Sequence, residues 1–148
     1  MRAVIQRVER AKVSVEGKTI ASIGKGLLLL IGIGKADERK DTEYLSRKIA
    51  NLRIFEDDKG KMNLNIKEVN GEILSIPQFT LFGDIRKGNR PGFDGAACPE
   101  SAVELWQELN ARLRTENIPV KEGEFRAHMQ VELVNDGPVT LWIDSGGI

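Results

Sequence analysis

The uninterrupted apolar run from Leu27 to Ile33 constrains the fold more than any other stretch of this 148-residue chain. It contains no charged or polar side chain, so it lacks the alternation of a strand with one face in water. This composition is typical of a strand that is buried on both faces. The run is also much shorter than the roughly 20 apolar residues that cross a bilayer. We therefore expect a central buried strand in a folded domain, and no association with a membrane.

Weaker patterns on either side of this run predict the remaining elements. Apolar and polar residues alternate in several segments, which is typical of half-buried strands. These predicted strands cover residues 3–8, 13–15, 18–20, 62–66, 73–82, 129–133 and 139–143, with a turn between the last two. Apolar residues spaced three or four apart predict one helix at residues 37–52, capped by Asp37 or Asp41, and a second that starts at Pro99.

No repeat or linker interrupts these elements. We therefore expect one α+β domain over residues 1–148, with a mostly antiparallel, barrel-like sheet and two main helices. Lys and Arg together number 22, and so do Asp and Glu. This balance excludes a general polyanion-binding surface and leaves a local patch or pocket for any nucleic acid. The N-terminal residues carry no export signal, so the cytoplasm is the expected location.

The sequence gives little support for metal or cofactor chemistry. One cysteine and one histidine cannot form an internal disulfide or an ordinary zinc site. We expect Cys98 to cap the second helix and His128 to be exposed on the polar face of its strand. The glycines around the central run lack both the dinucleotide-binding fingerprint and the Lys-Ser/Thr pair of a P-loop. No metal and no cofactor is therefore predicted.

The predicted strand at 73–82 carries polar residues at an unusual place. If it is extended throughout, Gln78 and Thr80 share one face with apolar side chains. They could simply bond to neighbouring backbone groups. Pro77, however, cannot donate to a strand ladder, so the backbone after it could be released from pairing. Free N–H groups beside an amide and a hydroxyl are the components of an oxyanion-binding site.

A long glycine-rich connection follows, from Gly83 to Pro99, and it carries Arg86, Lys87 and Arg90. A solvated surface loop explains this composition. Long irregular loops are, however, often functional, and three cations among glycines beside the candidate site would suit phosphate groups.

Two short motifs resemble the signatures of a known family, the D-aminoacyl-tRNA deacylases. PQFTL at 77–81 and NDGPVT at 135–140 match the motifs usually written SQFTL and NxGPxT. Further segments occur in family order over almost the whole chain, namely AVIQRV, GLLLLIGIGK, RIFED, GKMNLN, RPGF and MQVELVNDGPVT. The chain is therefore identified as resembling this family along its full length.

The resemblance implies a homodimer that binds the 3′ end of aminoacyl-tRNA. In the family, the SQFTL strand of one subunit and the Gly-Pro turn of the other form the pocket. The Gly137-Pro138 bond would be cis, and its main-chain atoms would exclude L-amino acids while D-amino acids and glycine fit. The family assigns an N-terminal arginine, here Arg7, to holding this turn, although an ordinary surface arginine would fit the strand pattern equally well. Phe125 and Met129 match positions near the family pocket, and both could also be core residues.

The implied reaction is hydrolysis of the ester of D-aminoacyl-tRNA, together with glycyl-tRNA mischarged on tRNA-Ala. We expect backbone N–H groups at Gln78, Phe79 and their neighbours to stabilise the oxyanion. Thr80 is a candidate nucleophile, but no base that could activate it lies beside it in the sequence. Assistance by the terminal ribose hydroxyl of the tRNA is therefore the expected route.

One residue departs from the family motif, because Pro77 replaces the usual serine. A related branch that edits small L-amino acids also tends to carry proline there, so relaxed chirality is one alternative. Another alternative is a nucleic-acid-binding module that keeps the fold without the reaction. A bare dimeric scaffold would not require polar residues at Gln78 and Thr80.

Overall fold

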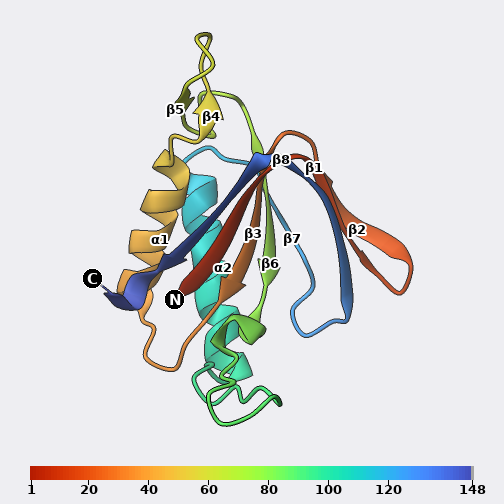
Figure 1. The fold of residues 1–148 in the computed structure, drawn as a ribbon, viewed down its shortest axis with the longest axis vertical. Coiled ribbons are helices and arrows are strands. Elements are labelled where there is room, and N and C mark those ends of the chain that lie inside the picture. The colour runs from red at the N-terminus through yellow and green to blue at the C-terminus, as the bar shows by residue number, and fades with distance from the viewer. Residues whose placement is uncertain (148) are drawn as a thin grey trace.

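β3 (Gly26–Gly32) runs through the middle of the sheet in the computed structural model, which describes residues 1–147 (Figure 1). It pairs antiparallel with β1 (Arg2–Val15) on one side and parallel with β6 (Glu72–Pro77) on the other. Every residue of β3 is buried except Leu30, which is partly exposed. The prediction of a central strand buried on both faces is confirmed.

The other strands extend this arrangement into a curled, mixed sheet. β2 (Lys18–Ile23) pairs antiparallel with the second half of β1, and β8 (Met129–Asp144) pairs antiparallel with β1 along almost its whole length. β7 (Val120–Glu122) adds to β6 in parallel, and β4 (Phe55–Glu56) and β5 (Met62–Leu64) form a separate small sheet. The large sheet curls until it nearly closes, so the expected α+β class with a mostly antiparallel, barrel-like sheet is confirmed.

The curl creates two apolar cores, one on each face of β3. Leu27, Leu29 and Ile31 belong to the larger core, which lies between the sheet and the helices. Leu28 points to the other face and packs in a smaller core with residues of β1 and β6. The alternation of side chains along a strand explains why neighbouring leucines enter different cores.

Both predicted helices are present and lie on the same face of the sheet (Figure 1). α1 (Arg39–Asn51) begins after Glu38, so the prediction of Asp37 or Asp41 as the N-cap is wrong. Asp41 instead accepts a hydrogen bond from the Glu38 amide at 2.8 Å, which completes a capping box. α2 (Pro99–Thr115) starts with Cys98 at its N-cap, as predicted, although the thiol does not cap the helix.

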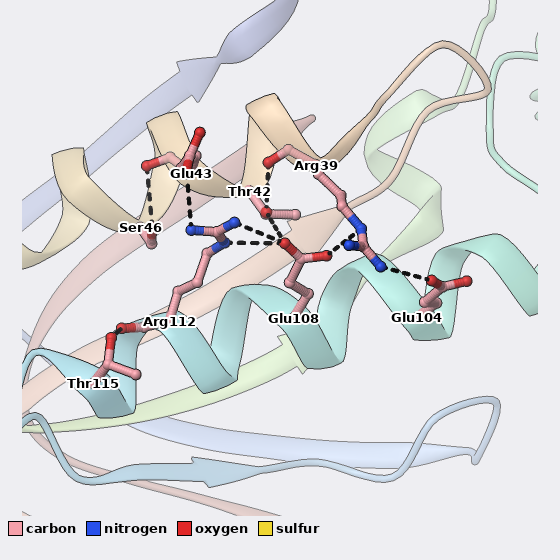
Figure 2. A network of polar contacts seen from close by, with 8 residues as sticks. All are labelled: Arg39, Thr42, Glu43, Ser46, Glu104, Glu108, Arg112 and Thr115. Atoms are coloured by element: carbon pink, nitrogen blue, oxygen red, sulfur yellow. Dashed lines mark hydrogen bonds and ion pairs between the residues drawn. The ribbon is translucent and has the colours of Figure 1, made fainter.

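A network of charged side chains joins the exposed edges of the two helices (Figure 2). Glu108 of α2 is its centre and accepts from Arg112 at 3.0 Å and from the Thr42 hydroxyl at 3.2 Å. Arg39 approaches the same carboxylate at 3.4 Å. Arg39 and Thr42 lie on α1, and Glu108 lies on α2, 66 residues after Thr42 in the chain. The network therefore adds to the apolar contacts that hold α1 against α2.

Hydrogen bonds link the residues that follow β8 to the start of α1. η2 (Ser145–Gly147) follows β8, and the buried Ser145 hydroxyl donates to the Asp41 carboxylate at 2.6 Å. The amino group of Met1 donates to the same hydroxyl at 2.6 Å. Within residues 1–147, no helix is long and apolar enough to span a membrane.

Candidate active site

Pro77 ends β6, so the prediction of one extended strand over residues 73–82 is wrong. The chain turns at once into the short 3-10 helix η1 (Phe79–Phe82). The Gln78 amide donates to the Ile31 carbonyl of β3 at 2.7 Å. The expectation that this N–H is released from pairing is therefore wrong. Gln78 and Thr80 therefore do not share a strand face, and it is the amides after Gln78 that become available.

The start of η1 presents two backbone N–H groups without partners. The first N–H groups of any helix lack acceptors within that helix. Within the described chain, residues 1–147, neither the Phe79 amide nor the Thr80 amide donates to a backbone or side-chain acceptor. Two adjacent free amides at the edge of a cavity can bind a developing negative charge.

That cavity has a volume of about 640 Å³ and lies between η1, α2 and the segment that enters β8. Its size falls in the usual range for a small-molecule site, roughly 300–1,000 Å³. Apolar and aromatic side chains make most of the wall. The lining residues of the predicted site are Pro77, Gln78, Phe79, Phe125 and Met129.

Aromatic side chains fix the shape of this cavity. Phe79 packs edge-on against Phe93, with ring centroids 5.0 Å apart. Trp106 lies 6.1 Å from Phe125 and donates its indole N–H to the buried Ser75 hydroxyl at 2.9 Å. Because buried indole and hydroxyl groups must be paired, this bond locks the tryptophan ring in position. From the sequence alone, Trp106 is only one of the apolar residues, spaced three or four apart, that predict this helix.

Thr80 lies just outside the lining of the cavity and is exposed. Its hydroxyl accepts a hydrogen bond from the Gln78 side-chain amide. Among residues 1–147, no carboxylate lines the cavity, and the only ionisable side chains in its lining are those of Arg126 and His128. His128 is exposed, as predicted, but it precedes β8 instead of lying within the strand. The arrangement offers Thr80 no buried Asp or Glu as a base.

The NDGPVT segment forms a bulge within β8, so the prediction of a turn between two strands is wrong. Thr140 pairs with Gln6 of β1 and Asn135 pairs with Val8, so residues 136–139 of β8 all lie opposite one residue, Arg7. The Asn135 side-chain amide closes the base of the bulge by donating to the carbonyls of Arg7 and Val139, both at 3.0 Å. Gly137 and Pro138 are exposed at its tip, and the peptide bond between them is cis.

Arg7 is only 4% exposed, so it is not the surface arginine that the strand pattern allowed. Its Nε donates to the Asp136 carbonyl at 3.2 Å and lies 3.0 Å from the Asp136 carboxylate. Its Nη1 donates to the Ile54 carbonyl at 2.6 Å. A buried guanidinium thus links the bulge to the segment between α1 and β4. The space is also tight, because a Cβ added at Gly137 would lie 2.9 Å from Nη2 of Arg7.

The predicted site residues therefore fall into two groups within one chain. Residues of the PQFTL segment meet Phe125 and Met129 at the cavity, whereas Arg7, Gly137 and Pro138 do not line it. In Figure 1, η1 lies at the lower end of the sheet and the bend of β8 at the upper end. Sequence reasoning missed Phe93, Ser75 and Arg126, because only the fold brings them to this place.

The glycine-rich loop between η1 and α2 carries fewer uncommitted charges than the sequence suggested. The Arg86 guanidinium, hydrogen-bonded to Asp84, lowers the pKa of that carboxyl to about 2. The two residues thus neutralise each other. Lys87 and Arg90 are exposed, and phosphate binding by this loop stays a prediction.

A search for related families matches residues 4–144 to a model described as D-Tyr-tRNA(Tyr) deacylase. A protein of Thermosipho africanus named D-aminoacyl-tRNA deacylase is 57% identical over 98% of this chain and 97% of its own length. A protein of the same name from Thermotoga petrophila is 53% identical over the same shares of the two chains.

Two solved structures have the same fold. One, described as c-Myc DNA Unwinding Element Binding Protein, superposes with a TM-score of 0.91 at 42% identity and covers 98% of this chain and 99% of its own. The other, described as a probable eukaryotic D-amino acid tRNA deacylase, has a TM-score of 0.82 at 16% identity and covers 96% and 97%. The second match bears on the fold alone.

Proposed function

Because this chain belongs to the D-Tyr-tRNA(Tyr) deacylase family and is therefore a hydrolase that acts on aminoacyl-tRNA, we propose that it removes D-amino acids from tRNA at the η1 cavity and rejects their L-enantiomers. The observation that carries this proposal is that Phe79, which lines an aromatic cavity, and the adjacent Thr80 both have backbone amides that bind no acceptor within residues 1–147. Aminoacyl-tRNA is made in the cytoplasm, where we propose that the enzyme works.

The reaction needs an oxyanion site more than a side-chain nucleophile. Water attacks the ester carbonyl, the carbonyl oxygen gains negative charge, and the Phe79 and Thr80 amides donate to it. Collapse of the intermediate breaks the bond to the ribose oxygen, which takes up the proton that the attacking water has lost, leaves as a hydroxyl and releases the amino acid. The neighbouring ribose hydroxyl of the tRNA orients the water, since no carboxylate of residues 1–147 lines the cavity to do so. Thr80 contributes its backbone rather than its hydroxyl.

Chiral selection, in this proposal, comes from the bulge of a second subunit. Gly137 and Pro138 are exposed and lie apart from the cavity of their own chain, which suits a segment that completes the site of a partner. Arg7 holds the bulge with bonds to two carbonyls, so its main-chain atoms present a fixed wall. An L-side chain would clash with that wall, and a D-side chain would point away from it. Glycine has no side chain, so glycyl-tRNA mischarged on tRNA-Ala is also a substrate.

The direct test is ester loss from D-tyrosyl-tRNA and L-tyrosyl-tRNA prepared on the same tRNA, and from glycyl-tRNA and L-alanyl-tRNA prepared on tRNA-Ala. We expect rapid release of D-tyrosine and glycine and slow release of L-tyrosine and L-alanine. Comparable hydrolysis of both enantiomers would support the relaxed-chirality alternative, in which Pro77 changes the pocket. No hydrolysis of any ester would refute the proposal.

Complementation tests whether the site spans two chains. Ala102→Phe fills the cavity from α2, and Gly137→Ala disturbs the bulge because its Cβ would meet Arg7. We expect each variant to be inactive alone and their mixture to regain about a quarter of wild-type activity, since half of randomly formed dimers are mixed and each has one intact site. Full activity at the mass of one 16.4 kDa chain would contradict the shared site.

A nucleic-acid-binding module without deacylase activity is the second candidate, favoured by the 42% identity to the c-Myc DNA Unwinding Element Binding Protein. This alternative predicts tight binding of DNA and no effect on that binding when the cavity is filled. Measuring DNA affinity and deacylation on the same wild-type and Ala102→Phe samples separates the two functions.

A further inference from the structure

Arg126 has a positive φ, a backbone conformation that is unfavourable for a residue with a side chain. The Ala127 amide donates to the Glu124 carbonyl at 3.2 Å, which makes residues 124–127 a β-turn. Arg126 is its third residue and has φ of 67°, whereas Phe125 is not among the residues with positive φ. This pattern defines a type II turn, in which the third position strongly favours glycine or asparagine. An arginine kept at such a position is best explained by what its side chain does.

The same residue lies at the cavity and carries an uncommitted charge. In the part of the chain that the structure describes, Arg126 and His128 are the only ionisable residues of the lining, and both are on the segment that leads into β8. Within residues 1–147, the Arg126 guanidinium takes part in none of the ion pairs. By contrast, Arg7, Arg86 and Arg114 each pair with a carboxylate. The edge of the cavity therefore carries a guanidinium with which no carboxylate among residues 1–147 forms an ion pair.

We propose that Arg126 binds a phosphate of the single-stranded 3′ end of the tRNA, next to the terminal aminoacyl-nucleoside. This inference rests on the proposed function and adds a residue that positions the substrate. When the aminoacyl ester is at η1, the chain of the tRNA must leave the cavity across its rim, and the first charged group that it presents is the phosphate before the terminal nucleoside. A guanidinium matches a phosphate with two parallel hydrogen bonds.

The effect should be on binding and not on the chemical step, because the guanidinium meets a phosphate that does not react. The variants are Arg126→Gly, which suits the turn, and Arg126→Lys, which keeps the charge. Arg10→Ala is the matched control, since Arg10 is also exposed but lies on β1 and does not line the cavity. The substrates are D-tyrosyl-tRNA and D-tyrosyl-adenosine, an ester that has no phosphate.

For Arg126→Gly we expect KM for D-tyrosyl-tRNA to rise about 5- to 10-fold with kcat unchanged, and Arg126→Lys to recover part of this loss. The slope of log KM against log salt concentration should fall by about 0.7, the value for one phosphate on a single strand. D-tyrosyl-adenosine should be hydrolysed equally by wild type and variant. Tm of Arg126→Gly should rise by about 2 °C, since glycine relieves the positive φ.

The outcomes separate this inference from the proposed function. If wild type hydrolyses D-tyrosyl-tRNA but Arg126→Gly keeps the same KM and the same salt slope, the Arg126 contact is refuted and the deacylase stands. An equal loss on D-tyrosyl-adenosine would also refute it, because that would indicate a damaged cavity. If wild type hydrolyses neither substrate, the proposed function itself fails.

Discussion

Replacing Arg7 by methionine should destabilise the protein strongly, although Arg7 lies in a strand whose pattern allows a surface residue. The change keeps an unbranched apolar stem and removes the guanidinium. The variant loses one hydrogen bond to the Ile54 carbonyl at 2.6 Å and another to the Asp136 carbonyl at 3.2 Å. Because Ile54 is only 7% exposed, water cannot easily take over the first of these bonds.

The magnitude follows from these contacts. A hydrogen bond from a charged donor contributes about 1.5–3 kcal/mol, so two such bonds amount to roughly 3–6 kcal/mol. The ion pair with Asp136 adds little to this sum, because that side chain is 41% exposed and water screens the pair. The total is a large share of the roughly 5–15 kcal/mol that stabilises a typical domain. We therefore expect Arg7→Met to lower Tm by about 10 °C.

Denaturant unfolding and deacylation assays on the same samples measure both consequences. Arg10→Met is the control, because Arg10 is exposed on the same strand and should change stability by less than about 0.5 kcal/mol. Arg7→Lys should recover no more than half of the loss, since one ammonium cannot reach both carbonyls as the planar guanidinium does. If Arg7→Met and Arg10→Met unfold within about 1 kcal/mol of each other, the structural role given to Arg7 is wrong.

Three further perturbations test other parts of the account. Thr80→Ala should keep appreciable kcat on D-aminoacyl-tRNA, because its hydroxyl lies outside the cavity lining; a folded variant that binds substrate but has no activity would make Thr80 the nucleophile. Gly26→Ala should abolish folding, since its Cβ would lie 1.8 Å from a β6 carbonyl oxygen, whereas Gly24→Ala, whose nearest contact is 3.9 Å, should melt close to wild type in circular dichroism scans. Burial raises the pKa of Asp41, but hydrogen bonds, above all from the Ser145 hydroxyl, outweigh it and leave the pKa below its usual value. The stability advantage of wild type over Asp41→Asn should therefore be complete above about pH 4 and decline as pH falls further; equal denaturation curves at neutral pH would contradict this.

The sequence predicted the elements whose pattern is local. The apolar run from Leu27 to Ile33 predicted a strand with both faces buried, and the spacing in α2, with Pro99 at its first position, predicted that helix and its start. The two motif segments were found as well, because PQFTL and NDGPVT are short and contiguous. The conformation of these segments, and their contacts in the folded chain, could not be predicted from the sequence pattern alone.

Three features depended on tertiary contacts that no local pattern carries. The sequence predicts that Pro77 frees the backbone after it from strand pairing, but the Gln78 amide donates to the Ile31 carbonyl and the chain then turns into η1. The NDGPVT segment looked like a hairpin turn, yet β1 is long enough to pair with both of its flanks. Arg7 alternates like a surface residue, and only its distant carbonyl partners explain why it is buried.

The single-turnover rate of ester loss from D-tyrosyl-tRNA, compared with L-tyrosyl-tRNA, tests the central claim most directly when wild type and Ala102→Phe are measured side by side. The account predicts fast hydrolysis of the D-ester by wild type, little hydrolysis of the L-ester, and loss of the D-activity in a variant whose cavity is filled but whose fold is intact. Equal rates on both enantiomers, or full D-activity in Ala102→Phe, would contradict it.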